Sequence, residues 1–363
     1  MVPATKISRN GKEWNMINFT DCETTKARYG GANGGKLGII YQGERYLLKF
    51  PGKAKLADDL SYTNGSISEY IGSHIFNAVG IQAQETELGI YQTGTGAKLV
   101  VACKDFTDQE HGIVLQDFAS IKNSVIDSDQ HGYGTNLNDV LESIQEQDSM
   151  DPDGLMEHFW DMFVVDEMLG NPDRHNGNWG ILYDFQRDTC RIAPVYDCGS
   201  SLFPQASAQT IQKMLSSKQE LNIRVYERPT SALTLDNGKR INYNTFNEQH
   251  MQDYPDYCRA LIRMEPKINM INIGKIIDNT PGLNNLQAEF YKTIITERKR
   301  MLLDRALDRA IDLGYTKEAM LDDRPIPGAH DYSRQEQKNC ISLQDFKEKA
   351  KDVYPIELDD FDR

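Results

Sequence analysis

The spacing of apolar residues divides the chain into a strand-rich first part and a helix-rich second part. Apolar runs at residues 36–41 and 45–50, separated by a turn that contains glycine, predict a β-hairpin. Over residues 66–80 apolar side chains recur every four positions and the segment ends in glycine, which predicts an amphipathic helix with a glycine cap. Two further short strands are predicted at residues 87–91 and 98–102, around a glycine turn.

After Asp105 the pattern becomes mainly helical. Helices are predicted where apolar residues collect on one face, at residues 155–169, 268–277, 286–313 and 342–353. A polar loop at residues 171–180 and two short strands, at residues 180–185 and 190–196, lie between the first two of them. Residues 204–247 show a mixed pattern that favours neither helix nor strand.

These segments predict an α+β protein with two lobes. The small β-rich N-lobe covers residues 1–105, and the larger, mainly helical C-lobe covers residues 106–316. A short connector near residues 102–108 joins them, and residues 317–363 form a polar C-terminal extension. The 363 residues, of which 39% are apolar, are enough for two sizeable cores.

Charge and cysteine content narrow the class of protein. The 54 acidic residues exceed the 40 basic ones and give a net charge of −14, which disfavours binding to nucleic acid or to an anionic membrane. The first residues contain charges and no apolar run, so no signal peptide is expected. The 6 cysteines are scattered and form no CxxC pair, which disfavours a zinc site or a disulfide framework. We therefore expect a cytoplasmic protein with reduced thiols.

A glycine-rich segment at residues 28–38, RYGGANGGKLG, directly precedes the first predicted hairpin. Glycines allow backbone amides to approach an anion closely, although a flexible surface turn is the simpler explanation for this segment alone. The segment lacks the GxxxxGK[ST] pattern of a P-loop, and it opens a strand rather than a helix, unlike a dinucleotide-binding fingerprint.

Lys49 lies among apolar residues on the second strand of this hairpin. A lysine that faces inward there needs an anionic partner, and in kinases such a lysine pairs with ATP phosphates and with an acid on the following helix. Glu69 is the candidate acid. Alternatives remain for both residues, because Lys49 can protect a sheet edge and Ser66 with Glu69 forms the pattern of a helix capping box.

The loop NPDRHNGNWG carries the clearest chemical pattern. Asp173 and Asn178 lie five positions apart on a segment too rich in Pro and Gly to be helical, so the loop can present a carboxylate and an amide together. Further along, Asp197 is expected at the end of a strand, just before Cys198-Gly199. Phosphoryl transfer uses such a set, because one aspartate orients the attacking hydroxyl while Asn and a second aspartate hold Mg²⁺. Taken singly, each pattern is more typical of an ordinary turn.

In this order, these motifs resemble the HipA-type kinases, bacterial toxin kinases with a two-lobed protein-kinase-like fold. The resemblance rests on GGANGGK, YLLKFP, SEYIGSHIFNAVGI, VVACKDF, NPDRHNGNWG and APVYDCGSSL, and it covers most of residues 28–205. The Asp-Arg-His-x-x-Asn core is shared with phosphatidylinositol kinases. The pairing of DRHxxN with YDxxSS is much more specific to the HipA side.

The resemblance implies roles for individual residues. Asp173 would be the catalytic base, Asn178 and Asp197 the magnesium ligands, Lys49 the phosphate-binding lysine and Glu69 its partner. The residues that would contact ATP through the glycine loop and the hinge are Gly31, Ala32, Asn33, Gly34, Gly35, Lys36, Ala102, Cys103 and Lys104. Two departures from the family matter: no additional N-terminal subdomain is expected, and Arg28 replaces a phosphorylatable serine ahead of the loop.

The sequence therefore predicts a kinase that uses ATP and Mg²⁺ to phosphorylate Ser or Thr of a protein, with an antitoxin protein as a candidate partner. A phosphoinositide-type lipid kinase and a nucleotide-binding pseudokinase remain as alternatives. The lack of Lys or Arg between Asp197 and Lys213 disfavours the lipid kinase. Candidate autophosphorylation sites in and after this segment are Ser200, Ser201, Ser207 and Thr210. We expect His175 to bond the loop backbone rather than to take part in catalysis.

Overall fold

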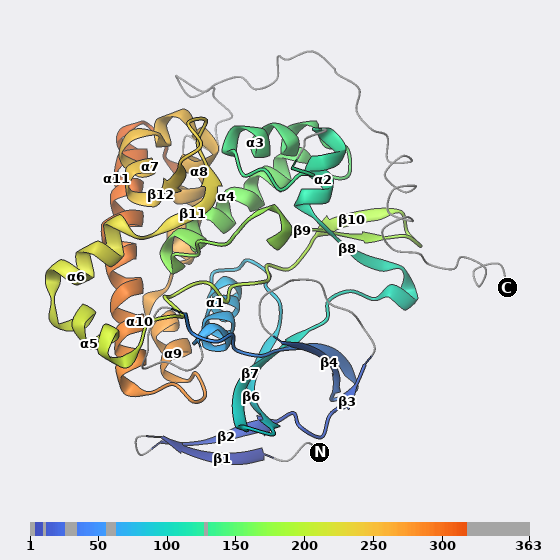
Figure 1. Cartoon of the computed structure of the whole chain (residues 1–363). Coiled ribbons are helices and arrows are strands. Elements are labelled where there is room, and N and C mark those ends of the chain that lie inside the picture. The colour runs from blue at the N-terminus through green and yellow to red at the C-terminus, as the bar shows by residue number, and fades with distance from the viewer. Residues whose placement is uncertain (1–3, 10–11, 26–34, 56–62, 127–129, 318–363) are drawn as a thin grey trace.

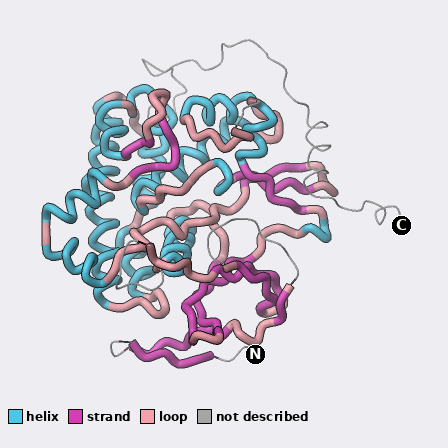
Figure 2. The backbone as a smooth tube through the Cα atoms, viewed as in Figure 1, coloured by secondary structure: helices cyan, strands magenta, loops and turns pink. Residues whose placement is uncertain are grey.

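A strongly curled sheet forms one end of the molecule and helices form most of the rest (Figures 1 and 2). The computed structural model describes residues 4–9, 12–25, 35–55, 63–126 and 130–317. The main sheet has seven strands in the order β1-β2-β6-β7-β5-β4-β3, and smaller sheets have the orders β10-β9-β8 and β11-β12. Only the β2–β6 pairing of the described strands is parallel. The two-lobed α+β prediction is confirmed.

The strands are β1 (Ala4–Arg9), β2 (Lys12–Asn18), β3 (Glu23–Thr24), β4 (Lys36–Tyr41), β5 (Glu44–Lys49), β6 (Thr86–Thr93), β7 (Gly96–Lys104), β8 (Ile113–Asp117), β9 (Gly180–Asp184), β10 (Thr189–Ile192), β11 (Thr230–Thr234) and β12 (Arg240–Asn242). The α-helices are α1 (Gly65–Ala78), α2 (Phe118–Val125), α3 (Leu137–Glu146), α4 (Pro152–Leu169), α5 (Ala208–Ser216), α6 (Lys218–Asn222), α7 (Tyr243–Gln249), α8 (Pro255–Met264), α9 (Met270–Asp278), α10 (Asn285–Arg298) and α11 (Asp304–Asp312). Short 3₁₀ helices are η1 (Gln109–His111), η2 (Asn176–Asn178), η4 (Met251–Asp253) and η5 (Glu265–Lys267), and π-helical turns are η3 (Ile223–Glu227) and η6 (Lys299–Leu303).

The predicted hairpin is β4–β5. Its two-residue turn places Gln42 at φ 54° and Gly43 at φ 84°, the left-handed conformations that match the twist of a tight hairpin. The second predicted pair is β6–β7, and each of these strands is longer than expected. Sequence periodicity thus identified four of the strands of the main sheet.

Helix α1 lies between the sheet and the helical part (Figure 1). Its apolar face, with Ile67, Ile71 and Ile75, is buried, and Gly80 at φ 84° follows its end as the glycine pattern predicts. The capping-box interpretation is wrong. The N-cap residue is Asn64, so Glu69 lies inside the helix and its side chain is free to face the sheet.

Helix α4 forms the centre of the helical lobe. The Asp151 side chain accepts from the Gly154 N–H at its start, Pro152 occupies the first turn, and Gly170 at φ 63° ends it. Most of its residues are buried, because α3, α8 and α10 pack around it. The buried side chains of this lobe join those of α1 in one core, while the two faces of the curled sheet carry smaller clusters.

Strand β8 is an element that the sequence prediction missed. It pairs with β9, which in turn pairs with β10, so the segment after Asp105 is not purely helical. A second correction concerns the strand expected to end at Asp197, since β10 already ends at Ile192. A single parallel bridge between Val195 and Ala83 then holds the chain just before Asp197.

The helical region at residues 286–313 is confirmed as α10, η6 and α11 in succession, and α9 corresponds to the helix expected at residues 268–277. The mixed region 204–247 contains α5, α6, η3, β11, β12 and the start of α7. The helix expected at residues 342–353 lies outside the described residues. None of the helices that the structure describes combines the length and apolar character needed to cross a bilayer.

Candidate active site

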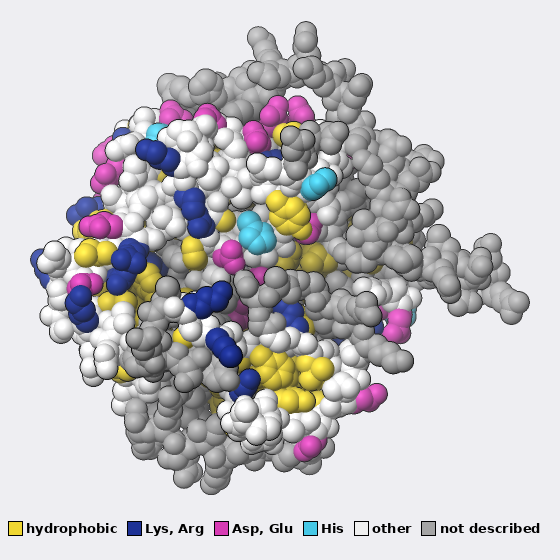
Figure 3. Space-filling model, in the orientation of Figure 1, with side chains coloured by type: hydrophobic (Ala, Val, Ile, Leu, Met, Phe, Trp, Pro, Cys, Tyr) yellow, Lys and Arg dark blue, Asp and Glu magenta, His cyan; other side chains and the backbone are white. Residues whose placement is uncertain are grey.

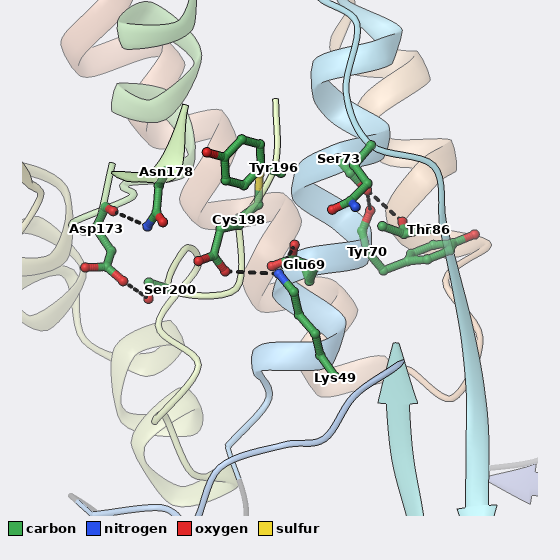
Figure 4. A network of polar contacts seen from close by, with 12 residues as sticks. Lys49, Glu69, Tyr70, Ser73, Thr86, Asp173, Asn178, Tyr196, Cys198 and Ser200 are labelled. Atoms are coloured by element: carbon green, nitrogen blue, oxygen red, sulfur yellow. Dashed lines mark hydrogen bonds and ion pairs between the residues drawn. The ribbon is translucent and has the colours of Figure 1, made fainter. Parts of the chain in front are cut away.

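The loop after α4 presents Asp173 at the junction of the lobes. Gly170 turns the chain out of the helix, and the Asn171 side chain then donates to Asp166 Oδ1 (3.0 Å) and accepts from the Asp173 N–H (3.1 Å). The Asn178 amide donates to the carbonyl of Asp173 (2.9 Å). These local bonds hold the two polar side chains of the motif on one face of the loop (Figure 4).

Arg174 connects this loop to the segment that carries Asp197. Its buried guanidinium donates from Nε to Asp166 Oδ2 (2.8 Å) and from Nη1 to the carbonyl oxygens of Asn178 (2.7 Å) and Tyr196. Since one nitrogen reaches both carbonyls, Asn178 and the residue before Asp197 must lie side by side. Burial alone would lower the pKa of Arg174, but Asp166 outweighs it and raises that pKa, so the crosslink stays charged.

Lys49 is the meeting point of three elements. Its Nζ lies 2.9 Å from Glu69 Oε1 on α1 and 3.1 Å from Asp197 Oδ1 (Figure 4). Burial alone would lower the pKa of Lys49, but the two carboxylates raise it well above its usual value. Burial would likewise raise the pKa of Asp197, and Lys49 instead lowers it. Lys49 and Asp197 are therefore both charged at neutral pH.

The backbone at Asp197 is unusual. Its φ of 58° lies in the left-handed region, where Asp is tolerated better than most residues other than glycine. The side chain is 42% exposed, in contrast to 3% for Glu69. Glu69 thus fixes the lysine from the buried side, while Asp197 remains partly exposed to solvent.

The glycine loop is described only in part. Gly31, Ala32, Asn33 and Gly34 lie outside the described residues, whereas Gly35 and Lys36 lead into β4. Lys36 lies opposite Lys49 in the β4–β5 pairing, so this second lysine is near the same cluster. Burial, and then the neighbouring charge of Lys49, lower the pKa of Lys36.

The hinge residues expected at positions 102–104 form the end of a strand. Ala102 and Cys103 are inside β7, which pairs with β5 on one side and with β6 on the other. The Lys104 N–H donates to the carbonyl of Glu85 (2.8 Å). These residues therefore belong to the sheet, and their contact with adenine stays a prediction.

Two residues next to Asp173 complete the site. Ser200 Oγ donates to Asp173 Oδ2 (3.2 Å), a contact that no sequence motif predicted in particular. His175 Nδ1 accepts from the Gly177 N–H (3.0 Å), which confirms the expectation that it bonds the loop backbone. Arg174 was part of the recognised motif, but its role as a crosslink depends on partners distant in sequence.

The residues present fit a magnesium nucleotide. The carboxylate of Asp197 and the amide oxygen of Asn178 are the hard oxygen ligands that Mg²⁺ prefers, and one or two protein ligands suffice when phosphates supply others. Among the described residues there is no cluster of three or more His, Cys, Asp or Glu side chains that would hold a metal by itself. Lys49 adds a compact cation for phosphate oxygens.

The structure combines a curled sheet, whose lysine pairs with a helix glutamate, with a helical lobe that carries the Asp-x₄-Asn loop and Asp197. This combination defines a phosphotransferase of the protein-kinase-like class. Residues 28–266 match the family described as HipA-like C-terminal domain. The chain belongs to this family, as the sequence motifs predicted.

Relatives of known class agree with the fold. The serine/threonine-protein kinase CtkA of Helicobacter pylori is 47% identical over 298 residues, which are 82% of this chain and 89% of the relative. A crystal structure of this proinflammatory kinase matches with a TM-score of 0.77, over 83% of this chain and 99% of that one. The expected protein-kinase-like fold and enzyme class are thereby confirmed.

A weaker likeness concerns the toxin–antitoxin prediction. HipA of Shewanella oneidensis, in a complex with HipB and operator DNA, matches with a TM-score of 0.40 at 15% identity, over 78% of this chain and 68% of that one. This similarity is too low to carry an argument about partners.

Proposed function

We propose that this chain transfers the γ-phosphoryl group of ATP, with Mg²⁺, to a Ser or Thr hydroxyl of a protein. The observation that carries the proposal is the placement of Lys49 between Glu69 and Asp197, with Asp173 and its bound hydroxyl on the neighbouring loop. The name of the relative, a serine/threonine-protein kinase at 47% identity, supports the choice of acceptor.

Each residue of the cluster has a definite task in this function. Asp173 orients the acceptor hydroxyl and takes up its proton at a carboxylate oxygen. Lys49, aligned by Glu69, neutralises phosphate oxygens, and Asp197 and Asn178 would hold the metal ion. When bound, Mg²⁺ supplies charge neutralisation on the phosphates. Arg174 keeps the two loops in register, so that the base and the metal ligands act on one phosphoryl group.

A lipid acceptor is less well supported. On the face seen in Figure 3, Lys and Arg side chains gather at the left edge and in a short row near the middle, with Asp and Glu side chains among them, and they do not merge into one continuous basic patch. Anionic vesicles are usually bound through clustered basic residues. The intact set of Asp173, Asn178 and Asp197 likewise disfavours a pseudokinase.

The function is tested with the purified full chain, labelled ATP and Mg²⁺, offered either a general protein acceptor or phosphoinositide vesicles. We expect label on protein Ser or Thr, its loss with a chelator, and no transfer to the vesicles. Transfer to vesicles alone would establish the lipid kinase. Nucleotide binding without transfer to either acceptor would establish the pseudokinase.

An antitoxin partner is a separate part of the proposal. A small DNA-binding protein encoded beside this chain, and one that co-purifies with it, would support a toxin–antitoxin pair. Growth unaffected by expression of the active chain without such a partner would contradict the toxin role.

A further inference from the structure

An exposed tyrosine lies against the loop at residues 171–180, called the Asp173 loop below. Tyr133, between α2 and α3, is 53% exposed, and it is the one aromatic among the large apolar side chains that are exposed in the described part of the chain. Its ring meets the His175 ring edge to face, with 6.3 Å between the centroids. A Cβ on Gly177 would lie 3.0 Å from Tyr133 Cε1, so the tyrosine covers the loop just after Asp173.

Buried hydrogen bonds hold this tyrosine in place. The Asn176 side chain, inside the Asp173 loop, donates to the carbonyl oxygens of Gly132 (2.8 Å) and Gly134 (2.9 Å), which flank Tyr133. The buried ammonium of Lys122 also donates to the Gly134 carbonyl (2.9 Å). Gly132 has a φ of 76°, and a Cβ there would lie 1.8 Å from a backbone oxygen of α2. The exposed ring thus stands on an anchored turn, and a partner can bind it without paying to order it.

A carboxylate accompanies the aromatic ring at the Gly177 end of the loop. Asp117 pairs with Gly180 in the β8–β9 ladder, just after Gly177, which brings Asp117 to the same end of the loop as Tyr133. The charge of Asp117, and then burial, raise the pKa of Tyr133. A negative charge and the face of a tyrosine ring are therefore available together beside the Asp173 loop.

The opposite end of the loop carries a positive charge. Arg240 donates from Nε to the carbonyl of Ser231 (2.8 Å) and from Nη2 to the carbonyl of Pro172, which directly precedes Asp173. A cationic side chain of an acceptor is therefore repelled at the Pro172 end and attracted at the Gly177 end. Because the face of a tyrosine ring also attracts cations, the Gly177 end suits the side chain of Arg or Lys.

We propose that Tyr133, together with Asp117, binds an Arg or Lys residue that flanks the phosphorylated Ser or Thr of the acceptor protein. This inference rests on the proposed function and adds a specificity-determining residue to it. The ring contacts the acceptor and not the reacting atoms, so its loss changes the KM for the acceptor rather than turnover or the KM for ATP. The expected rise in the KM for a basic acceptor is roughly 3- to 30-fold, the range that cation–ring contacts cover.

The test uses the full chain with ATP, Mg²⁺ and sets of peptides that share a central Ser. In each set one flanking position is fixed as Arg, Leu or Glu, and the other positions are mixed. We expect one flanking position at which Arg gives faster phosphorylation than Leu or Glu. Tyr133→Ala should lose this preference at an unchanged KM for ATP. Tyr133→Phe should keep it, because the ring remains.

Two other variants complete the test. Asp117→Asn removes the charge and keeps a side chain that can cap α2, so it should weaken the preference for Arg and leave the fold intact. Ile271→Ala is the matched control, because Ile271 is an apolar side chain on α9 that is 72% exposed and belongs to no part of the site. This control should behave as wild type.

The outcomes separate this inference from the proposed function. If peptides or a protein acceptor are phosphorylated but no flanking position selects Arg, the inference fails and the function stands. A preference for Arg that persists in Tyr133→Ala overturns the role of Tyr133, as does a rise in the KM for ATP in place of a changed preference. If neither the peptides nor a protein acceptor are phosphorylated, both proposals fail together.

Discussion

The buried carboxyl group of Glu167 should make the stability of the protein depend on pH, and Glu167→Gln should remove that dependence. The phenol oxygen of Tyr257 lies 2.8 Å from Glu167 Oε2 and 2.7 Å from Asn247 Oδ1, yet a phenol carries a single proton. If Glu167 is protonated, it donates to the phenol, the phenol donates to Asn247, and the Asn247 amide donates back to Glu167 Oε1 (2.7 Å). Every polar group of the ring is then satisfied.

The burial of Glu167 also favours its protonated form, because burial raises the pKa of Glu167 from 4.5 to about 8. The folded state therefore holds the proton over a pH range in which the unfolded chain releases it. The stabilisation is fully present below about pH 4.5 and is lost as the pH rises through about 8. At 1.36 kcal/mol per pKa unit, the loss over the whole range is on the order of 5 kcal/mol.

Neighbouring groups do not titrate in the same window. Burial lowers the pKa of Arg298 only to about 10, and burial raises that of Tyr257 well above its usual value. Gln at position 167 resembles the protonated acid, because its amide can donate to the Tyr257 phenol and its carbonyl can accept from Asn247. The variant keeps the ring without a titrating proton.

The assay is urea denaturation of wild type and Glu167→Gln at several pH values between 5 and 8. As the pH rises, the free energy of unfolding of the variant minus that of wild type should increase by about 1 kcal/mol per pH unit. Glu248→Gln, an exposed change on the same helix as Asn247, should follow wild type. Equal pH dependence of wild type and Glu167→Gln would refute the reasoning.

Three further changes test the site. Asp197→Asn should abolish Mg²⁺-dependent transfer and leave the circular dichroism spectrum unchanged; undiminished transfer would remove this residue from the mechanism. Asp173→Asn should lower turnover by roughly 10²–10⁴-fold with little change in ATP affinity by calorimetry, and a parallel loss of both would contradict its role as base. Arg174→Met should lower the free energy of unfolding by about 3–5 kcal/mol because Asp166 loses its partner, and the double variant with Asp166→Leu should regain part of that loss; additive losses in urea denaturation would argue against the buried pair.

Local patterns in the sequence determined much of the fold. The β4–β5 hairpin, α1 with its terminal Gly80, and α4 were predictable because turn geometry and helix caps depend on residues a few positions apart. The same holds for the loop that carries Asp173 and Asn178, whose composition excludes a regular helix. The family resemblance, which also rests on short motifs, identified the class of enzyme correctly.

Contacts between distant segments decided the rest. Whether Glu69 caps a helix or pairs with Lys49 depends on how α1 packs against β5, which the pattern around Glu69 does not specify. Strand pairing likewise involves partners far apart in the chain. β8 pairs with β9, and the part of β7 that contains Ala102 pairs with β5. Hydrophobic patterns indicate which face of a segment is buried, but the packing of the folded chain determines which side chains meet there, as the contact of Ser200 with Asp173 illustrates.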